Sequence, residues 1–311
     1  MKNFKFISIS LIFLGVFALS LVHFKITKES SVIVDIPEGS SIALISNILF
    51  EERLILNPIL FKTYTRLTLS DNKLQAGEYL IDSSQSVYTL NKKLLEGDFY
   101  YRKLTLLPGS TLKTILNLAN SVGLVDDLDS IDINLEEGIF YPDTYYYLKG
   151  ETFSSILYRS HMRWKEISNK LWDIRDDDLP YTNIMEATTL ASIIEKEGIE
   201  KETIAGVFVN RLKINMKLQS DPTVIYALGD NFDGDIKRKD LRIDSPYNTY
   251  RYRGLPPGPI SIVSEDSLRA ALRPKETDYL YFVSMGNGFH KFSKNLTEHN
   301  QAVLEYQLNE R

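Results

Sequence analysis

The feature that most constrains this chain is an uncharged, mostly apolar run near its N-terminus, Phe6–Val22. Lys2 and Lys5 precede the run, and charge returns only at Lys25. Its 17 residues would form roughly 25 Å of helix, which is enough to cross the hydrocarbon core of a bilayer. The run is longer than the apolar core of about 7–15 residues in a cleaved signal peptide. We therefore expect residues 1–24 to form a short cytoplasmic tail and a transmembrane anchor.

A cleaved signal peptide is the alternative, because Ala18–Ser20 offers a small–x–small cleavage pattern. The positive-inside rule gives little help, since two lysines stand on each side of the run. All the rest of the chain follows this single run. We therefore expect the N-terminus inside the cell and the bulk of the chain outside it.

Length and composition indicate an ordinary globular protein behind the run. The 311 residues leave room for about two domains, and 43% apolar with 25% charged residues is typical of a chain with a sizeable core. The net charge of −5 argues against nucleic acid as a partner, because phosphate contacts need clustered Lys and Arg. The sequence has no cysteine, which excludes disulfides, thiolate metal sites, cysteine nucleophiles and a lipoprotein anchor.

The segment behind the run has the pattern of a small α+β module. Residues 31–36 alternate like a strand, and a turn at Pro37–Ser41 opens a helix with serine as its N-cap. A second helix is expected over residues 58–67, and residues 74–81 return as a strand. We expect this module over residues 30–100 and a larger α+β domain over residues 101–311.

The larger domain contains the longest helix with apolar periodicity, which begins at Asn183 and ends at Gly198. A second helix follows as far as Leu212, and a further helix is expected over residues 152–172. Beyond Arg211 the sequence becomes rich in loops, at residues 219–222 and 244–258. A strand is expected at residues 279–283 and a last helix from about residue 296.

Several common catalytic constellations are absent from the sequence. It has no Gly-x-Ser-x-Gly elbow and no glycine loop that would cradle a phosphate. The segment Gly229–Asp235 resembles a calcium loop, but aligning Gly234 with the sixth position puts a glycine, not an acid, at position one. No metal site is predicted, since metal-ligand spacing is lacking among the four histidines, His23, His161, His290 and His299.

Carboxylate chemistry remains, and two glutamates stand at the end of the apolar helix. The helical neighbours of Glu195 are Ala191 and Ser192, which are small and leave room for a substrate. The neighbours of Glu197 are two isoleucines, and apolar surroundings raise the pKa of a carboxyl group so that it can donate a proton near neutral pH. A pair of solvated glutamates on an amphipathic helix is the alternative, and the pattern alone does not separate the two.

A run of polar and aromatic residues follows this helix, beyond what a surface loop needs. Sugars are bound by aromatic rings on their apolar faces and by amides and carboxylates on their hydroxyls. The segment Gly254–Gly258 is rich in proline and glycine and would hold such a loop in a stiff shape. We predict a substrate groove, whose candidate binding residues are Glu197, Gln219, Asp221, Tyr226, Tyr247, Asn248 and Tyr250.

Six segments of this region stand in a characteristic order: Ala191–Glu197 (ASIIEKE), Val207–Leu212 (VFVNRL), Met216–Tyr226 (MKLQSDPTVIY), Ser245–Tyr250 (SPYNTY), Gly254–Ile260 (GLPPGPI) and Tyr279–Val283 (YLYFV). Together with earlier segments such as Glu137–Tyr145 (EGIFYPDTY), they resemble the endolytic murein transglycosylases, also called the YceG-like family. The resemblance covers nearly the whole chain. One departure is Gly198, where many members carry threonine.

The resemblance implies a LysM-like module over residues 30–100 and a catalytic domain over residues 101–311. It also implies that Glu195, the first glutamate of Glu-Lys-Glu, is the catalytic acid. Glu195 would protonate the glycosidic oxygen leaving from N-acetylmuramic acid, and then accept the proton of the C6 hydroxyl of that sugar as it attacks C1. The product would be a 1,6-anhydro end. Such an enzyme needs no second carboxylate, no metal and no organic cofactor.

The resemblance further implies partners and a location. The substrate would be the glycan strands of nascent peptidoglycan, and the enzyme would work beside peptidoglycan synthases. A single N-terminal helix would hold it in the cytoplasmic (inner) membrane, with the catalytic domain in the periplasm.

Two other functions fit the residues less well. A hydrolytic muramidase would need a second carboxylate near Glu195, and Asp221 is the best candidate. A wall-binding protein without enzymatic activity would rest on the LysM-like module. Product chemistry separates the first from a transglycosylase, and survival of glycan binding in a Glu195→Gln variant without any cleavage separates the second.

Overall fold

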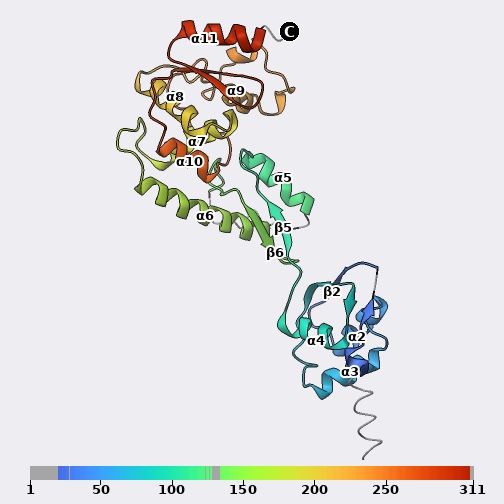
Figure 1. The fold of residues 1–311 in the computed structure, drawn as a ribbon. Coiled ribbons are helices and arrows are strands. Elements are labelled where there is room, and N and C mark those ends of the chain that lie inside the picture. Colours follow the sequence, from blue (N-terminus) through green and yellow to red (C-terminus); the bar gives the residue numbers. More distant parts are fainter. Residues whose placement is uncertain (1–19, 28, 123, 126, 128–133, 309–311) are drawn as a thin grey trace, which may run out of the picture. The chain divides into compact units, whose positions relative to one another are not determined.

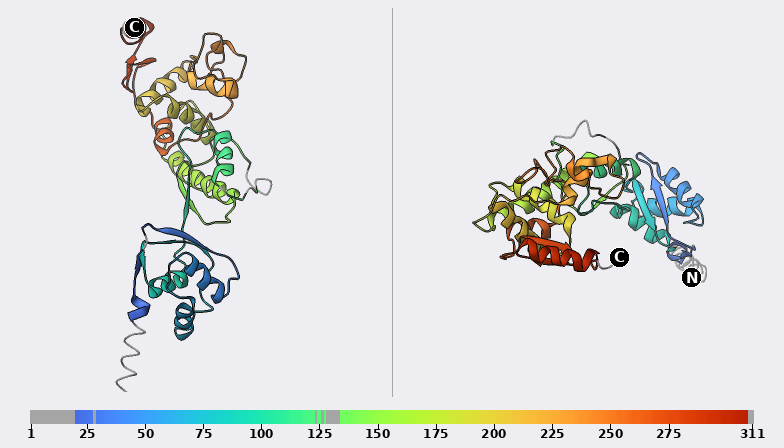
Figure 2. Two further views of the ribbon diagram at one scale, coloured as in Figure 1. Left: turned by 90° about the vertical axis from the view of Figure 1, so that its right-hand side faces the viewer. Right: turned by 90° about the horizontal axis from the view of Figure 1, so that it is seen from above.

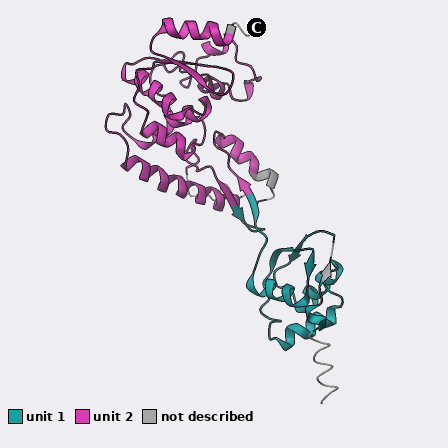
Figure 3. Ribbon diagram, viewed as in Figure 1, with its two compact units in different colours: residues 1–103, 146–150 teal, residues 104–145, 151–311 magenta. Residues whose placement is uncertain are grey.

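The computed structural model describes residues 20–27, 29–122, 124–125, 127 and 134–308. The chain divides into two compact units (Figure 3). Unit 1 comprises residues 1–103 and 146–150, and unit 2 comprises residues 104–145 and 151–311. Both units combine helices with short strand pairs, so the predicted α+β class is confirmed.

Unit 1 has the predicted strand–helix–helix–strand order. Strand β2 pairs antiparallel with β3, with Val34 opposite Tyr79. Val34, Ile36, Tyr79 and Ile81 of these strands enter one core with side chains of the helices. Helix α2 begins where the Ser41 side chain accepts a hydrogen bond from the backbone N–H of Leu44. The elements with most of their residues in unit 1 are β1 (Ile26–Thr27), β2 (Val32–Ile36), α2 (Ile42–Glu51), α3 (Pro58–Leu67), β3 (Gly77–Ile81), β4 (Ser84–Gln85) and α4 (Val87–Glu96).

Strands β5 (Arg102–Thr105) and β6 (Thr144–Tyr147) pair with each other, and the boundary between the units falls within them. Unit 2 is mainly helical, as Figure 1 shows. Its remaining elements are α5 (Leu112–Val122), α6 (Phe153–Asp173), α7 (Ile184–Glu197), α8 (Lys201–Lys213), α9 (Asp221–Leu228), η2 (Gly229–Asn231), η3 (Asp240–Arg242), α10 (Glu265–Leu272), β7 (Tyr281–Ser284), β8 (His290–Ser293), α11 (Leu296–Val303) and η4 (Leu304–Leu308).

Helix α7 lies at the centre of unit 2. Residues 187–194 of this helix are all buried, which is the pattern of a helix covered on every side rather than of an amphipathic surface helix. Helices α6, α8, α9 and α10 pack around it (Figures 1 and 2). The helix ends at Glu197, as predicted, because the extended backbone of Gly198 turns the chain toward α8. The two glutamates therefore stand where a buried helix reaches the edge of its core.

Helix α9 begins within residues 219–222, which were interpreted as a loop, and that interpretation was wrong. Helix α10 was not predicted. Asp221 and Pro222 form the first turn of α9, and α10 follows the proline-rich segment. Proline is favoured in the first turn of a helix, where its missing N–H is not needed. A serine, an aspartate and a proline in succession therefore begin a helix here instead of a loop.

The predicted membrane span, residues 6–22, lies outside the described residues except for its last three positions. In the part of the chain that the structure describes, no helix combines the length and the apolar character needed to cross a membrane.

Candidate active site

A pocket of about 620 Å³ opens in unit 2 between the end of α7, the start of α9 and the β7–β8 hairpin with α11. Of the predicted binding residues, four line this pocket: Glu197, Gln219, Asp221 and Tyr250. Glu197 ends α7, Gln219 lies in the loop before α9, Asp221 begins α9 and Tyr250 lies in a later loop, so the fold brings together residues up to 53 positions apart, from 197 to 250.

Glu197 is the partly buried acid of this pocket. Burial raises the pKa of Glu197 to about 7, and the nearby carboxylate of Asp221 acts in the same direction. A hydrogen bond donated by the Ser220 hydroxyl and the guanidinium of Arg211 oppose the rise in its pKa. Its position at the C-terminus of α7, where the helix dipole is negative, also disfavours the charged form. Glu197 can therefore donate a proton near neutral pH.

The loop before α9 holds Ser220 against Glu197. Ser220 occupies the N-cap position of α9, but its side chain makes no capping hydrogen bond. Its hydroxyl points toward Glu197, to which it donates. Thr249 holds this loop with two hydrogen bonds. Its carbonyl oxygen accepts from the backbone N–H of Gln219 at 3.2 Å, and its hydroxyl oxygen accepts from the backbone N–H of Ser220 at 3.0 Å. Gln219 itself has a φ of 50°, the left-handed region that a residue with a side chain seldom adopts.

Arg211 connects the loop to the hairpin. Its side chain is buried, and it donates to the carbonyl oxygens of Leu280 at 2.6 Å and Leu218 at 2.5 Å. Its guanidinium also lies over the ring of Tyr281, 5.3 Å from the centroid. Asp221 is fixed in turn by the hydroxyl of Tyr250, which donates to it at 2.5 Å. The walls of the pocket are thus held in place by hydrogen bonds within the protein.

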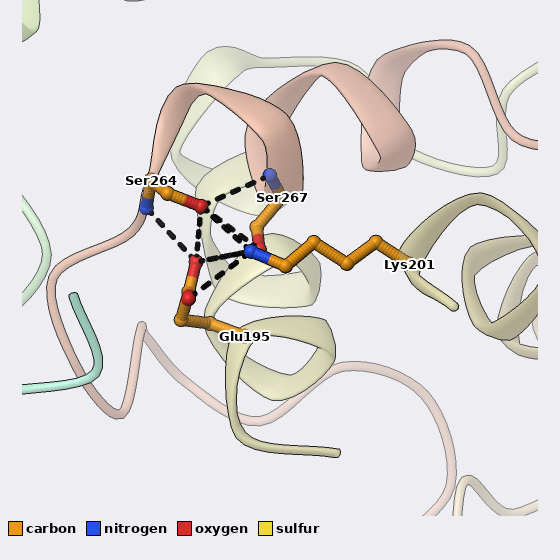
Figure 4. A network of polar contacts seen from close by, with 4 residues as sticks. All are labelled: Glu195, Lys201, Ser264 and Ser267. Atoms are coloured by element: carbon orange, nitrogen blue, oxygen red, sulfur yellow. Dashed lines mark hydrogen bonds and ion pairs between the residues drawn. The ribbon is translucent and has the colours of Figure 1, made fainter. Parts of the chain in front are cut away.

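Glu195 lies in a different environment, shown in Figure 4. It is not one of the residues that line the pocket, and its side chain is only 10% exposed. One of its oxygens accepts from the backbone N–H of Ser264 at 2.9 Å, from the Ser264 hydroxyl at 2.5 Å and from the Ser267 hydroxyl at 2.6 Å. The ammonium group of Lys201 lies 3.1 Å from the other oxygen.

These contacts determine the charge state of Glu195. Burial by itself would raise the pKa of this carboxyl group, but the hydrogen bonds from Ser264 and Ser267 and the charge of Lys201 outweigh burial and hold its pKa below the usual range. Glu195 is therefore an ionised group that fastens α7 to the start of α10 and to α8.

The remaining predicted residues lie elsewhere in unit 2. Tyr226 and Tyr247 pack against each other with ring centroids 4.9 Å apart, and the Tyr226 hydroxyl donates to Glu137 at 3.2 Å. Asn248 is fully buried, and its amide nitrogen donates to two carbonyl oxygens of the loop before it, at positions 241 and 243. None of the three lines the pocket, and their predicted role in binding substrate stays a prediction.

The comparison with known proteins covers almost the entire described chain. The YceG-like family matches residues 34–305. The chain belongs to the YceG-like family. Among relatives, it is 32% identical to the endolytic murein transglycosylase of Bacillus subtilis (strain 168), with 90% of this chain and 86% of that protein covered. It is 29% identical to the endolytic murein transglycosylase of Streptococcus pneumoniae serotype 2, with 92% of this chain and 60% of that protein covered.

A solved structure of a yceG-like protein from Listeria monocytogenes is similar in fold. It is 32% identical to this chain, with a TM-score of 0.52 that covers 88% of this chain and 99% of that one. The predicted membership of the YceG-like family is therefore confirmed by sequence and by structure.

Several pocket residues of this YceG-like chain were not predicted from its sequence. Arg211 lines the pocket, and Ser220 donates to Glu197. Both stand within the motifs that carried the resemblance, and a serine before Asp-Pro and an arginine inside an apolar helix were signals that could have been used. His290 and His299 line the pocket too, but only the fold brings them to Glu197. Among the described residues, no three or more histidine, aspartate or glutamate side chains gather as a metal site.

Proposed function

We propose that this chain is an endolytic murein transglycosylase that cuts the glycan strands of peptidoglycan with a single carboxyl group as acid and base. Relatives with this name cover most of the chain at up to 32% identity, which supports the reaction class. The observation that carries the chemistry is Glu197, a carboxyl group with a pKa of about 7 in the wall of the pocket.

Glu197 fits the role of general acid better than Glu195. A general acid must hold its proton near the working pH and must reach the bound substrate. Glu197 meets both conditions, whereas the oxygens of Glu195 are occupied by Ser264, Ser267 and Lys201 and its pKa is lowered. The role of Glu195 as the acid stays a prediction from resemblance, and the geometry favours its neighbour.

The proposed reaction has two proton transfers through Glu197. The protonated carboxyl group donates to the glycosidic oxygen as its bond to C1 of N-acetylmuramic acid breaks. The resulting carboxylate then takes the proton of the C6 hydroxyl as that oxygen bonds to C1. The products are a shortened strand with a 1,6-anhydro end and a free 4-hydroxyl on the leaving sugar. The proton returns to Glu197, so no water is consumed.

Hydrolysis is the second candidate reaction, because Asp221 lines the same pocket as Glu197 and could activate a water molecule. Mass spectrometry of the products from purified peptidoglycan distinguishes the two reactions. We expect fragments that end in 1,6-anhydro-N-acetylmuramic acid. Reducing ends in their place, lost in an Asp221→Asn variant, would establish a muramidase. Binding of glycan strands without any fragments would leave a wall-binding protein.

We also propose that residues 1–24 anchor the enzyme in the cytoplasmic membrane, that the rest of the chain lies in the periplasm, and that residues 30–100 form a LysM-like module. The run Phe6–Val22 supports the anchor, and confinement near the membrane would direct the enzyme to new strands beside peptidoglycan synthases. Cell fractionation with protease treatment of spheroplasts tests the location. Recovery of the full-length protein in the soluble fraction would contradict it.

A further inference from the structure

His290 is a titratable side chain of the pocket that the proposed reaction does not use. It is the first residue of β8 and lines the same pocket as Glu197. Its side chain is 8% exposed, so nearly all of the ring is in contact with protein. Phe282 and Phe292 pack beside it, with ring centroids 5.3 Å and 6.2 Å away. The imidazole is therefore held in one orientation.

Glu200 determines which nitrogen of the ring carries the proton. One oxygen of its carboxylate lies 2.7 Å from the backbone nitrogen of His290 and 3.2 Å from Nδ1 of the ring. An ionised carboxylate only accepts hydrogen bonds, so Nδ1 must donate. In the neutral ring the other nitrogen, Nε2, is then an acceptor. Within the described residues the hydrogen bonds of His290 are made by its backbone nitrogen and Nδ1, and none is made by Nε2.

Gly198 provides the space for this ring. A Cβ atom at this position would stand 2.7 Å from Cε1 of His290, which is closer than carbon atoms approach in folded proteins. The φ of Gly198 is 165°, an extended backbone that any residue adopts, so the absence of a side chain matters here only for space. Cε1 is bonded to Nε2, and Gly198 directly follows Glu197. The free nitrogen thus belongs to a ring that packs against the backbone next to the proposed acid.

From this arrangement we propose that Nε2 of His290 accepts a hydrogen bond from a hydroxyl group of the bound glycan and holds the sugar in place beside Glu197. Glycans are dense in hydroxyl donors, and an acceptor already held in one orientation loses little entropy on binding them. His290 then acts as a substrate-binding residue, Glu200 as its positioning residue, and Gly198 as the position that admits the ring. This inference rests on the proposed function, because it takes glycan as the ligand.

Two amide substitutions separate contact with substrate from a purely structural role. In His290→Asn the amide nitrogen can take the place of Nδ1 and keep the bond to Glu200, but nothing replaces Nε2. In His290→Gln the amide reaches the place of Nε2 and the bond to Glu200 is lost. We expect His290→Asn to keep the melting temperature of the wild type while kcat/KM on purified glycan strands falls about tenfold or more, the range for one hydrogen bond to substrate. His290→Gln should recover part of this loss.

The control is His161→Asn, the same substitution at a histidine whose Nδ1 lies 3.1 Å from a backbone carbonyl oxygen and which does not line the pocket. Its kcat/KM should equal that of the wild type. Gly198→Ala, which displaces the ring, should lower kcat/KM as His290→Asn does. Wild-type kinetics in His290→Asn would overturn the proposal and leave His290 as a link between β8 and α8.

A binding measurement keeps this test independent of the reaction. Soluble uncrosslinked glycan strands are titrated into Glu197→Gln and into the double variant Glu197→Gln/His290→Asn, and the dissociation constants are compared. A rise of about tenfold in the double variant supports the contact even if the wild type releases no anhydro product. Equal constants for the two proteins would contradict the contact, whatever the reaction is.

Discussion

Glu195 and Glu197 stand two residues apart at the end of α7, so their side chains point about 200° apart around the helix. On one side, Glu195 meets Ser264, Ser267 and Lys201, which stabilise its charge. On the other side, Glu197 lines the pocket, and among the described residues the hydroxyl of Ser220 donates to it. Burial acts to raise the pKa of both groups. At Glu195 the serine donors and the charge of Lys201 outweigh burial, whereas at Glu197 the charge of Asp221 adds to burial and the pKa stays raised.

Two glutamates within one turn of helix therefore have different roles, because their surroundings differ. A carboxylate surrounded by donors serves as a fixed negative charge that joins elements, whereas a carboxyl group short of donors keeps its proton and can transfer it. The pattern Glu-Lys-Glu contains both uses and gives no indication of which residue has which. Only the neighbours supplied by α8, α9 and α10 assign them.

The largest effects are expected when the carboxyl groups of Glu195 and Glu197 are removed one at a time, which tests which of them is the general acid. We expect Glu197→Gln to lower kcat by about 10³-fold or more, because a general acid and base contributes roughly 10²–10⁴-fold. Glu195→Gln should retain activity within about tenfold per folded molecule. The release of soluble fragments from purified peptidoglycan measures both rates. The reverse ranking would make Glu195 the acid, as the resemblance implies.

The second difference concerns stability. We expect Glu195→Gln to lower the free energy of unfolding by about 2–3 kcal/mol, because the Lys201 charge loses its partner and the serines lose an ionised acceptor. The pKa of Glu195 is lowered in the folded state, so its contribution is present above the pKa of the unfolded chain and is lost as pH falls. The gap between variant and wild type should narrow in acid, as urea unfolding at several pH values can measure.

A surface pair is the matched control for this stability measurement. Glu166 bonds to Lys170 one turn along α6, and both side chains are exposed. Exposed pairs of this kind contribute little to stability, because water and salt screen the two charges. An effect of Glu195→Gln no larger than that of Glu166→Gln would mean that the network in Figure 4 does not stabilise the fold.

The opposite sign is expected at the other glutamate. The folded state raises the pKa of Glu197 to about 7, so the stability it contributes is present below the pKa of the unfolded chain and is lost as pH rises through 7. Glu197→Gln cannot ionise at this position. At pH 8 its free energy of unfolding, measured with urea, should therefore exceed that of the wild type by roughly 1–2 kcal/mol, and at pH 4.5 the two values should be similar. A variant less stable than the wild type at pH 8 would contradict the raised pKa.

The smallest effect is expected from Ser220→Ala, which removes the hydroxyl that donates to Glu197. The hydrogen bond from Ser220 lowers the pKa of Glu197, so Ser220→Ala should raise it. The alkaline limb of the pH profile of kcat/KM should move upward by about half a unit to one unit, the equivalent of one hydrogen bond. A lower rate with an unmoved limb would mean that Ser220 acts only through packing.

Much of the fold could be predicted, because its signals are local. The strand at residues 32–36, the helix with serine caps that follows it, and the helix that ends at Gly198 each carry their own periodicity and end signals. Helices α9 and α10 were missed because each is only eight residues long, which is too short for an apolar period to appear.

The site could be predicted only in part. Gln219, Asp221 and Tyr250 follow from an unusual density of polar and aromatic residues, and the structure places them in one pocket. His290 carries no such signal, since its role depends on Glu200, 90 positions earlier. The different environments of Glu195 and Glu197 depend on which helix packs on which side of α7, and that information is not local.

Ser220 has a consequence for anyone who wishes to make this enzyme more robust. Its hydroxyl points toward Glu197 and not toward the first turn of α9, so the helix starts without the side-chain cap that its sequence offers. Selection for thermal stability would favour substitutions that cap this helix, since N-caps commonly contribute about 1 kcal/mol. Asp would cap the helix better, yet it would put a second negative charge beside Glu197. We expect heat-resistant variants selected at this position to be poor catalysts.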